Sequence, residues 1–480
     1  MQLPGRLRDA FRTAALPPGP RGIAALGAGL ALRRDPLAWL ARAHRRYGGV
    51  VALPGALRTT IAVFDPDAVS ALLRAPEPPL GKTTLGGLVS LAFSRGLAGA
   101  GILTLSGRDH QQHREVVLRS FARPHLVHYQ AITRELAADE LARWPLGALE
   151  LTSRVTALGK RVAHRLLFGV EHAACSAELG ASLDALAALL DESPVQLAVA
   201  SLVPFDLPLI STGGTARRRR DAVDRFLRAA FEQLDDRSMA HALRRHGRDL
   251  SWGHAQVRDN LVQLYVTGYD TTTCALTWTL YLLAQHPGVA SRVLGECSEV
   301  LRGQDPSLDD LGRMPYLDAV IKEALRLYPT GPYAYRSAQA ALELAGYAFP
   351  RGTVFLYSPW VTHRIPELFA DPEAFRPERF LGQSYPRGAY LPFGQGSRSC
   401  VAAVLATLQL KTLVAMIAQR FRIDVVPGQH LRAVSSNAVH LRPGLQVTLV
   451  PQDGDTARSP APVSGNVVGA RSPGARRPAA

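Results

Sequence analysis

The residues most suited to chemistry lie in one short stretch, residues 393–400, which reads Phe-Gly-Gln-Gly-Ser-Arg-Ser-Cys. Cys400 stands directly before an apolar segment, residues 401–418, that predicts a helix. Backbone N–H groups and the positive end of a helix dipole favour a thiolate at such a position. The glycines allow close approach of a flat partner, and Arg398 can bind an anion. This combination suggests a haem pocket with a cysteine axial ligand. The alternative is a buried structural cysteine, the commoner role of a lone cysteine.

A long apolar stretch, residues 257–286, predicts a helix that carries a second group of reactive side chains. One face of this helix holds residues spaced i, i+3, i+4 and i+7, namely Leu264, Thr267, Gly268 and Thr271. Glycine inside a helix costs ~1 kcal/mol relative to alanine, and a flat group against the backbone at Gly268 would compensate that cost. Asp270 beside Thr271 supplies the acid and the alcohol that a proton relay requires. From this segment alone, a packing notch of glycine and threonine is an equally good interpretation.

Charged residues in otherwise apolar surroundings form a third group. Glu323 and Arg326 lie three residues apart in a predicted helix at residues 317–328, and Arg379 follows in a proline-rich loop. Exposed pairs of this kind contribute less than ~1 kcal/mol to stability. A buried cluster of the three would instead tie the helix to the irregular loop before Cys400.

Basic residues that could hold anions come from several parts of the chain. His110 and Arg114 are four residues apart, and hence on one face of a predicted helix at residues 108–123. With Arg336 and Arg398 as companions, they could hold two carboxylates. A metal ion bound by the histidines of this helix is the weaker interpretation, because their spacing alone is unspecific.

The elements that would position these groups are mostly helical. Strand-like runs occur in three regions, residues 50–64, 344–357 and 421–449. The sequence therefore predicts a mainly α fold with a small β-rich subdomain. We expect an N-terminal arm at residues 1–15 and a single domain at residues 16–451. Residues 452–480 are rich in Pro, Gly, Ser, Ala and Arg, which predicts a disordered tail.

Composition narrows the class and the compartment of the protein. The 480 residues are 47% hydrophobic, and only four of the 55 basic residues are lysines. Such arginine use suggests a GC-rich bacterial genome, although the net charge of +15 still permits docking of an acidic protein. Without a recognition motif, nucleic-acid binding is not expected. Four cysteines without CxxC spacing fit a reducing cytosol, and no apolar stretch reaches the ~20 residues of a membrane span. We therefore expect a cytoplasmic protein.

Taken together, these groups resemble the cytochrome P450 family of haem-thiolate monooxygenases over roughly residues 16–451. Four positions of the cysteine loop match the family's Phe-x-x-Gly-x-Arg-x-Cys, namely Phe393, Gly396, Arg398 and Cys400. The charged cluster of the family is matched by Glu323, Arg326 and Arg379. Its oxygen-activation motif is matched by Gly268, Asp270 and Thr271, and its haem-propionate pair by His110 and Arg114. The resemblance implies the cytochrome P450 fold.

The resemblance also implies haem b as the cofactor, with its iron ligated by the Cys400 thiolate. Residues that would contact the haem are His110, Arg114, Arg336, Phe393, Gly394, Arg398 and Ala406. Asp270 and Thr271 would deliver protons during the activation of O2, and a C–H bond of the substrate would gain a hydroxyl group. The charged cluster formed by Glu323, Arg326 and Arg379 would be structural.

Three positions depart from the family's usual pattern. Ala402 stands where glycine commonly follows the ligand, Thr267 where Ala or Gly is common, and His110 where many members have Trp. No flavin or iron–sulfur segment is fused, so the resemblance implies electrons from a separate ferredoxin or flavodoxin with its reductase. An acidic donor of that kind suits a basic surface. We expect the protein to be a monomer.

The residues expected to line the substrate space are mostly apolar and include no charged anchor: Leu264, Thr267, Gly268, Thr330 and Tyr333. We therefore expect a lipophilic substrate, and a terpenoid or other secondary metabolite fits a GC-rich bacterial source. The alternatives are a haem-thiolate peroxygenase or fatty-acid hydroxylase, and a non-enzymatic haem sensor. The acid–alcohol pair at residues 270–271 argues against a peroxygenase, and an apolar distal face argues against a sensor.

Overall fold

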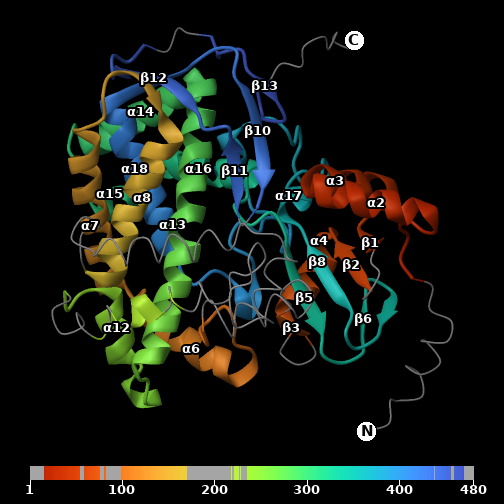
Figure 1. Ribbon diagram of the computed structural model, residues 1–480. Helices are drawn as coiled ribbons and strands as arrows, with labels where there is room; N and C mark the ends of the chain where they lie inside the picture. Colours follow the sequence, from red (N-terminus) through yellow and green to blue (C-terminus); the bar gives the residue numbers. More distant parts are fainter. Residues whose placement is uncertain are drawn as a thin grey trace, which may run out of the picture.

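The computed structural model describes residues 16–54, 59–75, 80–82, 99–169, 218, 221–225, 228, 235–436, 438–455 and 459–469. The expected N-terminal arm, residues 1–15, lies outside these ranges. Helices dominate the fold, as predicted (Figure 1). They are α2 (Ile23–Arg34), α3 (Pro36–Tyr47), α4 (Pro66–Arg74), α6 (Gly107–Arg119), α7 (Arg123–Leu141), α8 (Leu151–Phe168), α12 (Met239–His246), α13 (His254–Gln285), α14 (Pro287–Leu301), α15 (Leu308–Gly312), α16 (Pro315–Leu327), α17 (Pro359–Thr362) and α18 (Ala403–Arg420). Short 3-10 turns are η3 (Arg248–Leu250), η4 (Pro377–Phe380) and η5 (Gly396–Arg398).

The helical part is organised around α13, the long green helix that runs through it in Figure 1. This helix packs against α8, α16 and α18, and their apolar side chains join one continuous core. Figure 1 places α6 at the lower end of the helical part. In the part of the chain that the structure describes, no helix is both long and apolar enough to cross a lipid bilayer.

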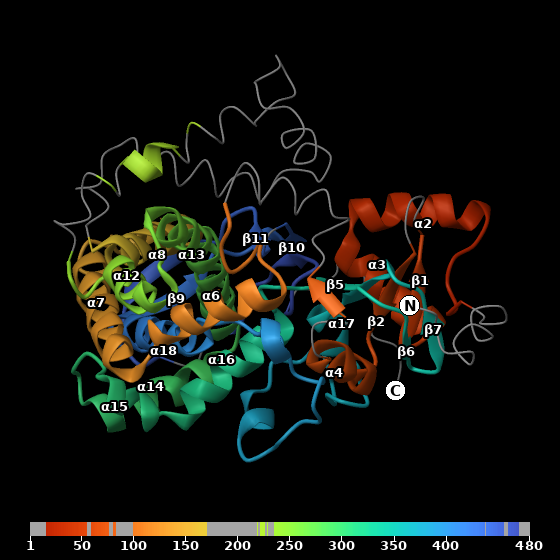
Figure 2. The ribbon, with the colours of Figure 1, turned by 90° about the horizontal axis from the view of Figure 1, so that it is seen from below.

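Strands form small sheets, of which the largest lies beside the helical part (Figure 2). The strands are β1 (Val50–Leu53), β2 (Thr60–Val63), β3 (Leu80–Lys82), β4 (Gly147–Glu150), β5 (Ala334–Ala338), β6 (Leu342–Leu344), β7 (Tyr347–Phe349), β8 (Val354–Tyr357), β9 (Phe421–Val425), β10 (His430–Ser435), β11 (Val439–Arg442), β12 (Gln446–Pro451) and β13 (Ser464–Gly465). The largest sheet has the order β1-β2-β8-β5-β3, and only its β2–β8 pair is parallel. Smaller sheets have the orders β4-β12-β9, β11-β10-β13 and β6-β7.

Aspartate and proline residues fix the start of two helices that pack beside this sheet. Asp35 accepts a hydrogen bond from the N–H of Ala38 at 3.0 Å, and Asp65 accepts one from the N–H of Ala68 at 2.9 Å. Each aspartate is followed by a proline, which suits the first helical position because the N–H it lacks would have no partner inside the helix.

Two sequence-based expectations are wrong. Residues 344–347, expected as a strand, contain the turn between β6 and β7, where Ala345 has φ of 51° and Gly346 has φ of 78°. Residues 459–469, expected to be part of a disordered tail, pack on the domain. Val463 and Val467 are buried there, and β13 pairs with β10. Long-range burial of these valines outweighs the disorder-prone composition around them.

Candidate active site

The cysteine loop joins the β-rich part to α18 and is closed by its own backbone. The Cys400 N–H donates to the carbonyl oxygen of Phe393 at 2.8 Å. Gly394 and Gly396 have φ of 67° and 75°, values that favour glycine. A Cβ atom at Gly396 would lie 2.0 Å from the carbonyl oxygen of Leu73, so only glycine lets this loop rest on α4. The geometry holds the cysteine at a fixed place before α18.

Cys400 itself has an exposed side chain, but its surroundings do not favour the thiolate. Burial raises the pKa of the Cys400 thiol, although the Ala402 N–H and the Arg114 guanidinium both act to lower it. In the polypeptide without its cofactor, desolvation of the thiol therefore outweighs one N–H group and one nearby charge. A coordinated metal ion deprotonates a thiol outright, so this finding does not oppose iron ligation.

Basic side chains surround the cysteine loop. Arg114, on α6, donates to the carbonyl oxygen of Ser399 at 2.7 Å and to its Oγ at 2.9 Å. Arg398 donates to Ser106 Oγ at 3.4 Å, and burial together with the Arg398 charge lowers the pKa of Arg114. His110 is buried one turn before Arg114 on the same helix. The structure therefore brings two of the predicted anion-binding arginines to one place.

Arg336 reaches the same loop through a tyrosine. It is buried on β5, donates to the carbonyl oxygen of Tyr335 at 2.9 Å, and lies 5.7 Å from the ring centre of Tyr357. The Tyr357 hydroxyl lies 3.6 Å from where a Cβ of Gly394 would be. Arg336 is thus separated from the cysteine loop by the Tyr357 side chain.

Two of the residues predicted to share one face of α13, Leu264 and Gly268, line a pocket, whereas Thr267 and Thr271 do not. Thr271 donates to the carbonyl oxygen of Thr267 at 2.8 Å, and Thr267 in turn donates to that of Gln263 at 2.7 Å. No atom lies within 4 Å of an added Cβ at Gly268, so there is room for a group against the backbone. Gly268 and Leu264 line a pocket with an empty volume of about 740 Å³.

Residues just after the cysteine line the same pocket from the other side. Ala402, Leu405 and Ala406, at the start of α18, face it together with α8 and α13. Its walls are mainly apolar, and none of its lining residues, all within the described part of the chain, carries a charge. Ala402, where glycine is usual in the family, therefore faces open space. The pocket connects the cysteine segment with the glycine of α13.

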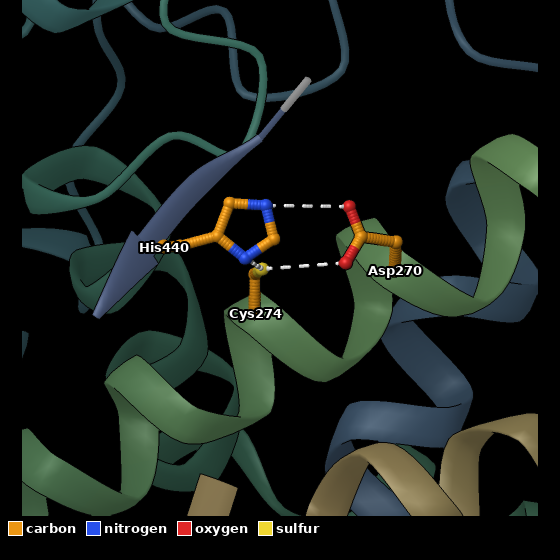
Figure 3. A group of neighbouring side chains, drawn as sticks. All are labelled: Asp270, Cys274 and His440. Atoms are coloured by element: carbon orange, nitrogen blue, oxygen red, sulfur yellow. Dashed lines mark hydrogen bonds and ion pairs between the residues drawn. The ribbon is translucent and has the colours of Figure 1, made fainter. Parts of the chain in front are cut away.

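Asp270 faces a different side of α13 from Thr271. Its Oδ2 lies 3.5 Å from His440 Nε2, and its Oδ1 lies 4.0 Å from Cys274 Sγ (Figure 3). Consecutive helical residues point about 100° apart at 3.6 residues per turn. Asp270 and Thr271, the expected partners of the proton relay, are therefore adjacent in sequence, but the Asp270 carboxylate points toward β11.

The two remaining substrate candidates lie beyond α16, in the segment that leads to β5. Thr330 is half-buried there. Tyr333 is also half-buried, and its hydroxyl accepts a hydrogen bond from Ser435 Oγ of β10 at 3.3 Å. Neither residue lines the pocket that contains Leu264 and Gly268.

Comparison with known proteins then identifies the family. The sequence profile described as Cytochrome P450 matches residues 17–449. This chain belongs to the cytochrome P450 family. A relative from Streptomyces melanosporofaciens, named Cyclooctat-9-en-7-ol 5-monooxygenase, is 33% identical over 86% of this chain and 90% of its own. Cyclooctatin synthase from the same organism is 29% identical over 86% of this chain and 91% of its own. A solved structure, retinoic-acid-bound cyanobacterial CYP120A1, has a TM-score of 0.77 at 22% identity and covers 92% of this chain and 100% of its own.

Family membership makes the protein a cytochrome P450 monooxygenase, whose cofactor is haem with a cysteine thiolate as axial ligand. The described cysteines differ sharply in their fitness for that role. Cys297 is fully buried in the core, and burial raises its pKa to about 12. Cys274 is buried on α13 against His440. Cys400 alone among the described cysteines has an exposed side chain, and the guanidinium groups of Arg114 and Arg398 lie beside its loop. The residues present therefore fit the haem.

The charged cluster of this P450 is fully buried. Glu323 accepts from Arg326 Nε at 2.7 Å and from Arg379 Nε at 2.9 Å. Arg326 also donates to the carbonyl oxygens of His363 and Pro372, at 2.8 and 2.7 Å. These three charged side chains thus connect α16 to η4 and to the segment between the two elements, which precedes the cysteine loop.

Replacing Glu323 with alanine is expected to destabilise the protein by about 3–5 kcal/mol, because both arginines would remain buried without their carboxylate. Urea unfolding followed by circular dichroism measures this loss. The matched control is Glu115→Ala, which removes the carboxylate from an exposed pair with Arg119 and should cost less than ~1 kcal/mol. Equal losses in the two variants would contradict a supporting role for the Glu323 cluster.

Sequence reasoning missed His363, which connects this cluster to the cysteine loop. Its Nδ1 lies 3.2 Å from the carbonyl oxygen of Arg326, and its Nε2 accepts the N–H of Leu391 at 2.7 Å. Because Nε2 accepts, the ring is neutral and Nδ1–H donates. Burial and the Arg326 charge lower the pKa of His363 to about 3. A lone histidine shows no periodic pattern that would have revealed this role.

The neutral state of His363 predicts acid sensitivity. The unfolded chain binds a proton at this histidine below pH 6.5, whereas the folded chain does so only near pH 3. Stability is therefore complete above pH 6.5 and falls by up to about 1.4 kcal/mol per pH unit below it. His363→Gln should be less stable at pH 7 but should flatten this slope. The free energies of unfolding of both proteins at pH 7 and pH 5 test this prediction. If the loss of stability between these two pH values is the same in His363→Gln as in the wild type, His363 is not the neutral buried group.

A second network that the sequence did not reveal positions the chain just before α6. The side chains of Asp259, Asn260 and Gln263 on α13 accept from the N–H groups of residues 100, 102 and 103, at 2.7, 3.0 and 2.7 Å. These contacts fix residues 100–103 against α13.

Proposed function

We propose that this P450 inserts one oxygen atom from O2 into a C–H bond of a terpenoid, with electrons from a separate donor. The observation that carries the substrate class is the uncharged pocket between α8, α13 and α18. An apolar pocket gains affinity mainly by removing apolar ligand surface from water. The name of the 33% identical relative describes oxidation of cyclooctat-9-en-7-ol, and this supports a lipophilic terpenoid.

We assign Cys400 as the axial ligand of the haem iron. The haem supplies the oxygen chemistry when it is bound, and the protein supplies position and electronics. The loop closed by the Cys400 N–H holds the sulfur in place, and Phe393 and Gly394 form the wall on that side. Ala406 lines the pocket one turn into α18. These residues match the family's cysteine motif at their positions.

The haem carboxylates would be held by the basic residues around the loop. Arg114 and Arg398 lie on both sides of Ser399, while Arg336 and His110 complete the group from β5 and α6. Charge-assisted bonds from guanidinium to carboxylate are among the strongest in proteins. This arrangement supports the anion-binding role.

Asp270 and Thr271 would move protons to the reacting centre. The Thr271 hydroxyl would hold a proton beside the pocket, since it belongs to the face that carries Gly268. Asp270 would supply protons from the other face of α13. Thr267 adds a hydroxyl to the substrate side, and Leu264, Gly268, Thr330 and Tyr333 would shape the substrate space.

A separate redox partner follows from the family, and an acidic ferredoxin or flavodoxin suits the net charge of +15. We propose a monomer in the cytoplasm, where the three described cysteines would remain thiols.

The test of this function compares two ways of driving turnover. Haem-loaded protein is screened against terpenoids for shifts of the haem spectrum, and ligands that bind are offered with NADPH, a ferredoxin and its reductase under 18O2. A product with one 18O atom supports the proposal. Product formed only with hydrogen peroxide would indicate a peroxygenase. Spectral binding with no turnover under either condition would favour a sensor.

Gly268 offers a test of the pocket itself. Gly268→Leu should keep the fold, because nothing lies within 4 Å of an added Cβ, but should abolish the spectral shifts that lipophilic ligands cause. Gly268→Ala is the matched control and should raise the free energy of unfolding by about 0.5–1 kcal/mol through helix propensity. Unchanged ligand shifts in the leucine variant, measured by absorption titration, would remove Gly268 from the pocket wall.

A further inference from the structure

A three-residue cluster lies on the side of α13 that faces β11. His440 bridges the other two members, with Nε2 at 3.5 Å from Asp270 Oδ2 and Nδ1 at 3.3 Å from Cys274 Sγ (Figure 3). The side chains of Asp270 and His440 are 20% and 15% exposed, so part of each side chain reaches solvent although the His440 Nε2 atom itself is buried. Cys274 is 7% exposed.

Contacts between α13, β10 and β11 fix the backbone around this cluster. Asp270 and Cys274 are four residues apart and share one face of α13. β11 is fixed to the same helix because Trp278 Nε1 donates to the carbonyl oxygen of Val439 at 2.7 Å. β11 also pairs with β10, where His440 lies opposite Val434. The imidazole is therefore placed by contacts that do not involve its own nitrogens.

The imidazole lacks a close partner on the side of the carboxylate. His440 Nε2 is buried and forms no hydrogen bond, and the Asp270 oxygen at 3.5 Å is slightly beyond good hydrogen-bond distance. Histidine is the side chain that gains and loses a proton near neutral pH. A small movement of the carboxylate would make this contact a direct path for a proton.

We propose that His440 is a positioning residue that supplies protons to Asp270. The proposal rests on the relay role of Asp270 proposed above. In the step, Nε2–H of protonated His440 gives its proton to the Asp270 carboxylate, leaving a neutral imidazole and a carboxylic acid. Asp270 passes that proton toward Thr271, and solvent reprotonates His440. No electrons move in these transfers.

The charged and titratable neighbours of His440 in the described chain come from three elements. Asp270 and Cys274 face it from α13, Arg442 lies two residues along β11, and Arg432 lies opposite Arg442 on β10. The arginines are exposed, so solvent screens their charges. Among the described residues, Asp270 is therefore the charged group in closest contact with His440.

The same three donors could instead bind a metal ion, since their S, N and O atoms lie within 4.8 Å of one another. The contacts favour the proton path. His440 directs a different ring nitrogen at each partner, whereas a metal ion would require one nitrogen, the sulfur and an oxygen to converge on one point.

The test uses the haem-loaded full chain with His440→Phe, His440→Gln and the control His430→Gln, which changes an exposed histidine of β10. Both His440 variants should keep the haem spectrum and ligand shifts but lose roughly tenfold in product formation, below the 10²–10⁴ range of direct acid–base catalysis. The wild-type rate should fall as the pH rises, because a neutral imidazole has no proton to give, and both variants should lack this fall. An unchanged rate and pH profile would overturn the proposal.

A second readout needs no turnover, so it separates this inference from a failure of the proposed function. In 13C-labelled histidine NMR, the resonance missing from His440→Gln identifies His440. With Asp270→Asn, the chemical shift of that resonance should change, because the carboxylate that lies 3.5 Å from His440 Nε2 is removed. An unchanged chemical shift would overturn the proposal. Stoichiometric Zn²⁺ binding that is lost in both Cys274→Ala and His440→Gln would also overturn it, in favour of a metal site.

Discussion

Cys400→Ala is expected to abolish monooxygenase activity and to remove the absorption band that thiolate ligation gives to the reduced carbon-monoxide complex. The reason is chemical, because no other exposed thiol exists in the described part of the chain and the loop has no spare ligand at that position. The fold should survive, since the loop is closed by the backbone bond between Cys400 N–H and the Phe393 carbonyl, which alanine keeps. The reduced carbon-monoxide spectrum and turnover of the purified variant are the measurements.

The controls for this prediction are the two other described cysteines. Cys274→Ala and Cys297→Ala should both keep the thiolate band, because one thiol faces His440 and the other is sealed in the core. A normal band in Cys400→Ala, or its loss in Cys274→Ala, would show that iron is bound elsewhere.

Removing the hydroxyl of Thr271 or the carboxylate of Asp270 should lower product formation by about 100-fold or more, the usual effect of losing a positioned acid or base. Thr271→Val and Asp270→Asn change shape little. Electron delivery does not depend on these groups, so NADPH oxidation should continue and release hydrogen peroxide in place of product. The ratio of product to NADPH, measured with a ligand that shifts the haem spectrum, reports the effect.

Thr277→Val is the matched control for the threonine variant. The Thr277 hydroxyl makes the same kind of bond, to the carbonyl oxygen of Thr273 at 2.8 Å, but it lies further along α13 and is buried, whereas Thr271 is half-buried. It should keep the wild-type ratio of product to NADPH. If Thr271→Val and Thr277→Val give the same ratio, the hydroxyl at 271 has no special part in proton delivery.

Local signals predicted much of the fold, and long-range packing decided the rest. α4 begins where the sequence indicates, because Asp65 caps the helix and Pro66 occupies its first position. The turn at Ala345 and Gly346 was missed because its apolar flanks look like one strand. The packing of Val463 and Val467 depends on β10 and α13, and nothing in the adjacent sequence encodes those partners.

The same distinction applies to the site. The cysteine loop and the Glu323–Arg326 pair are contiguous motifs, so their spacing alone locates them. His363 and His440 are single histidines that act across long sequence distances. The contact between Cys274 and His440 spans 166 residues, and only the tertiary fold brings them together. The direction of the Asp270 side chain could not be predicted either, because a helical pattern gives its face but not the strand packed on it.

The central claim is that the haem iron binds Cys400, and anomalous diffraction at the iron absorption edge tests it most directly. Crystals of the haem-loaded protein should show one strong iron peak within bonding distance of Cys400 Sγ, on the side facing α13. An iron peak beside Cys274 and His440, or any peak not bonded to Cys400, would contradict the account.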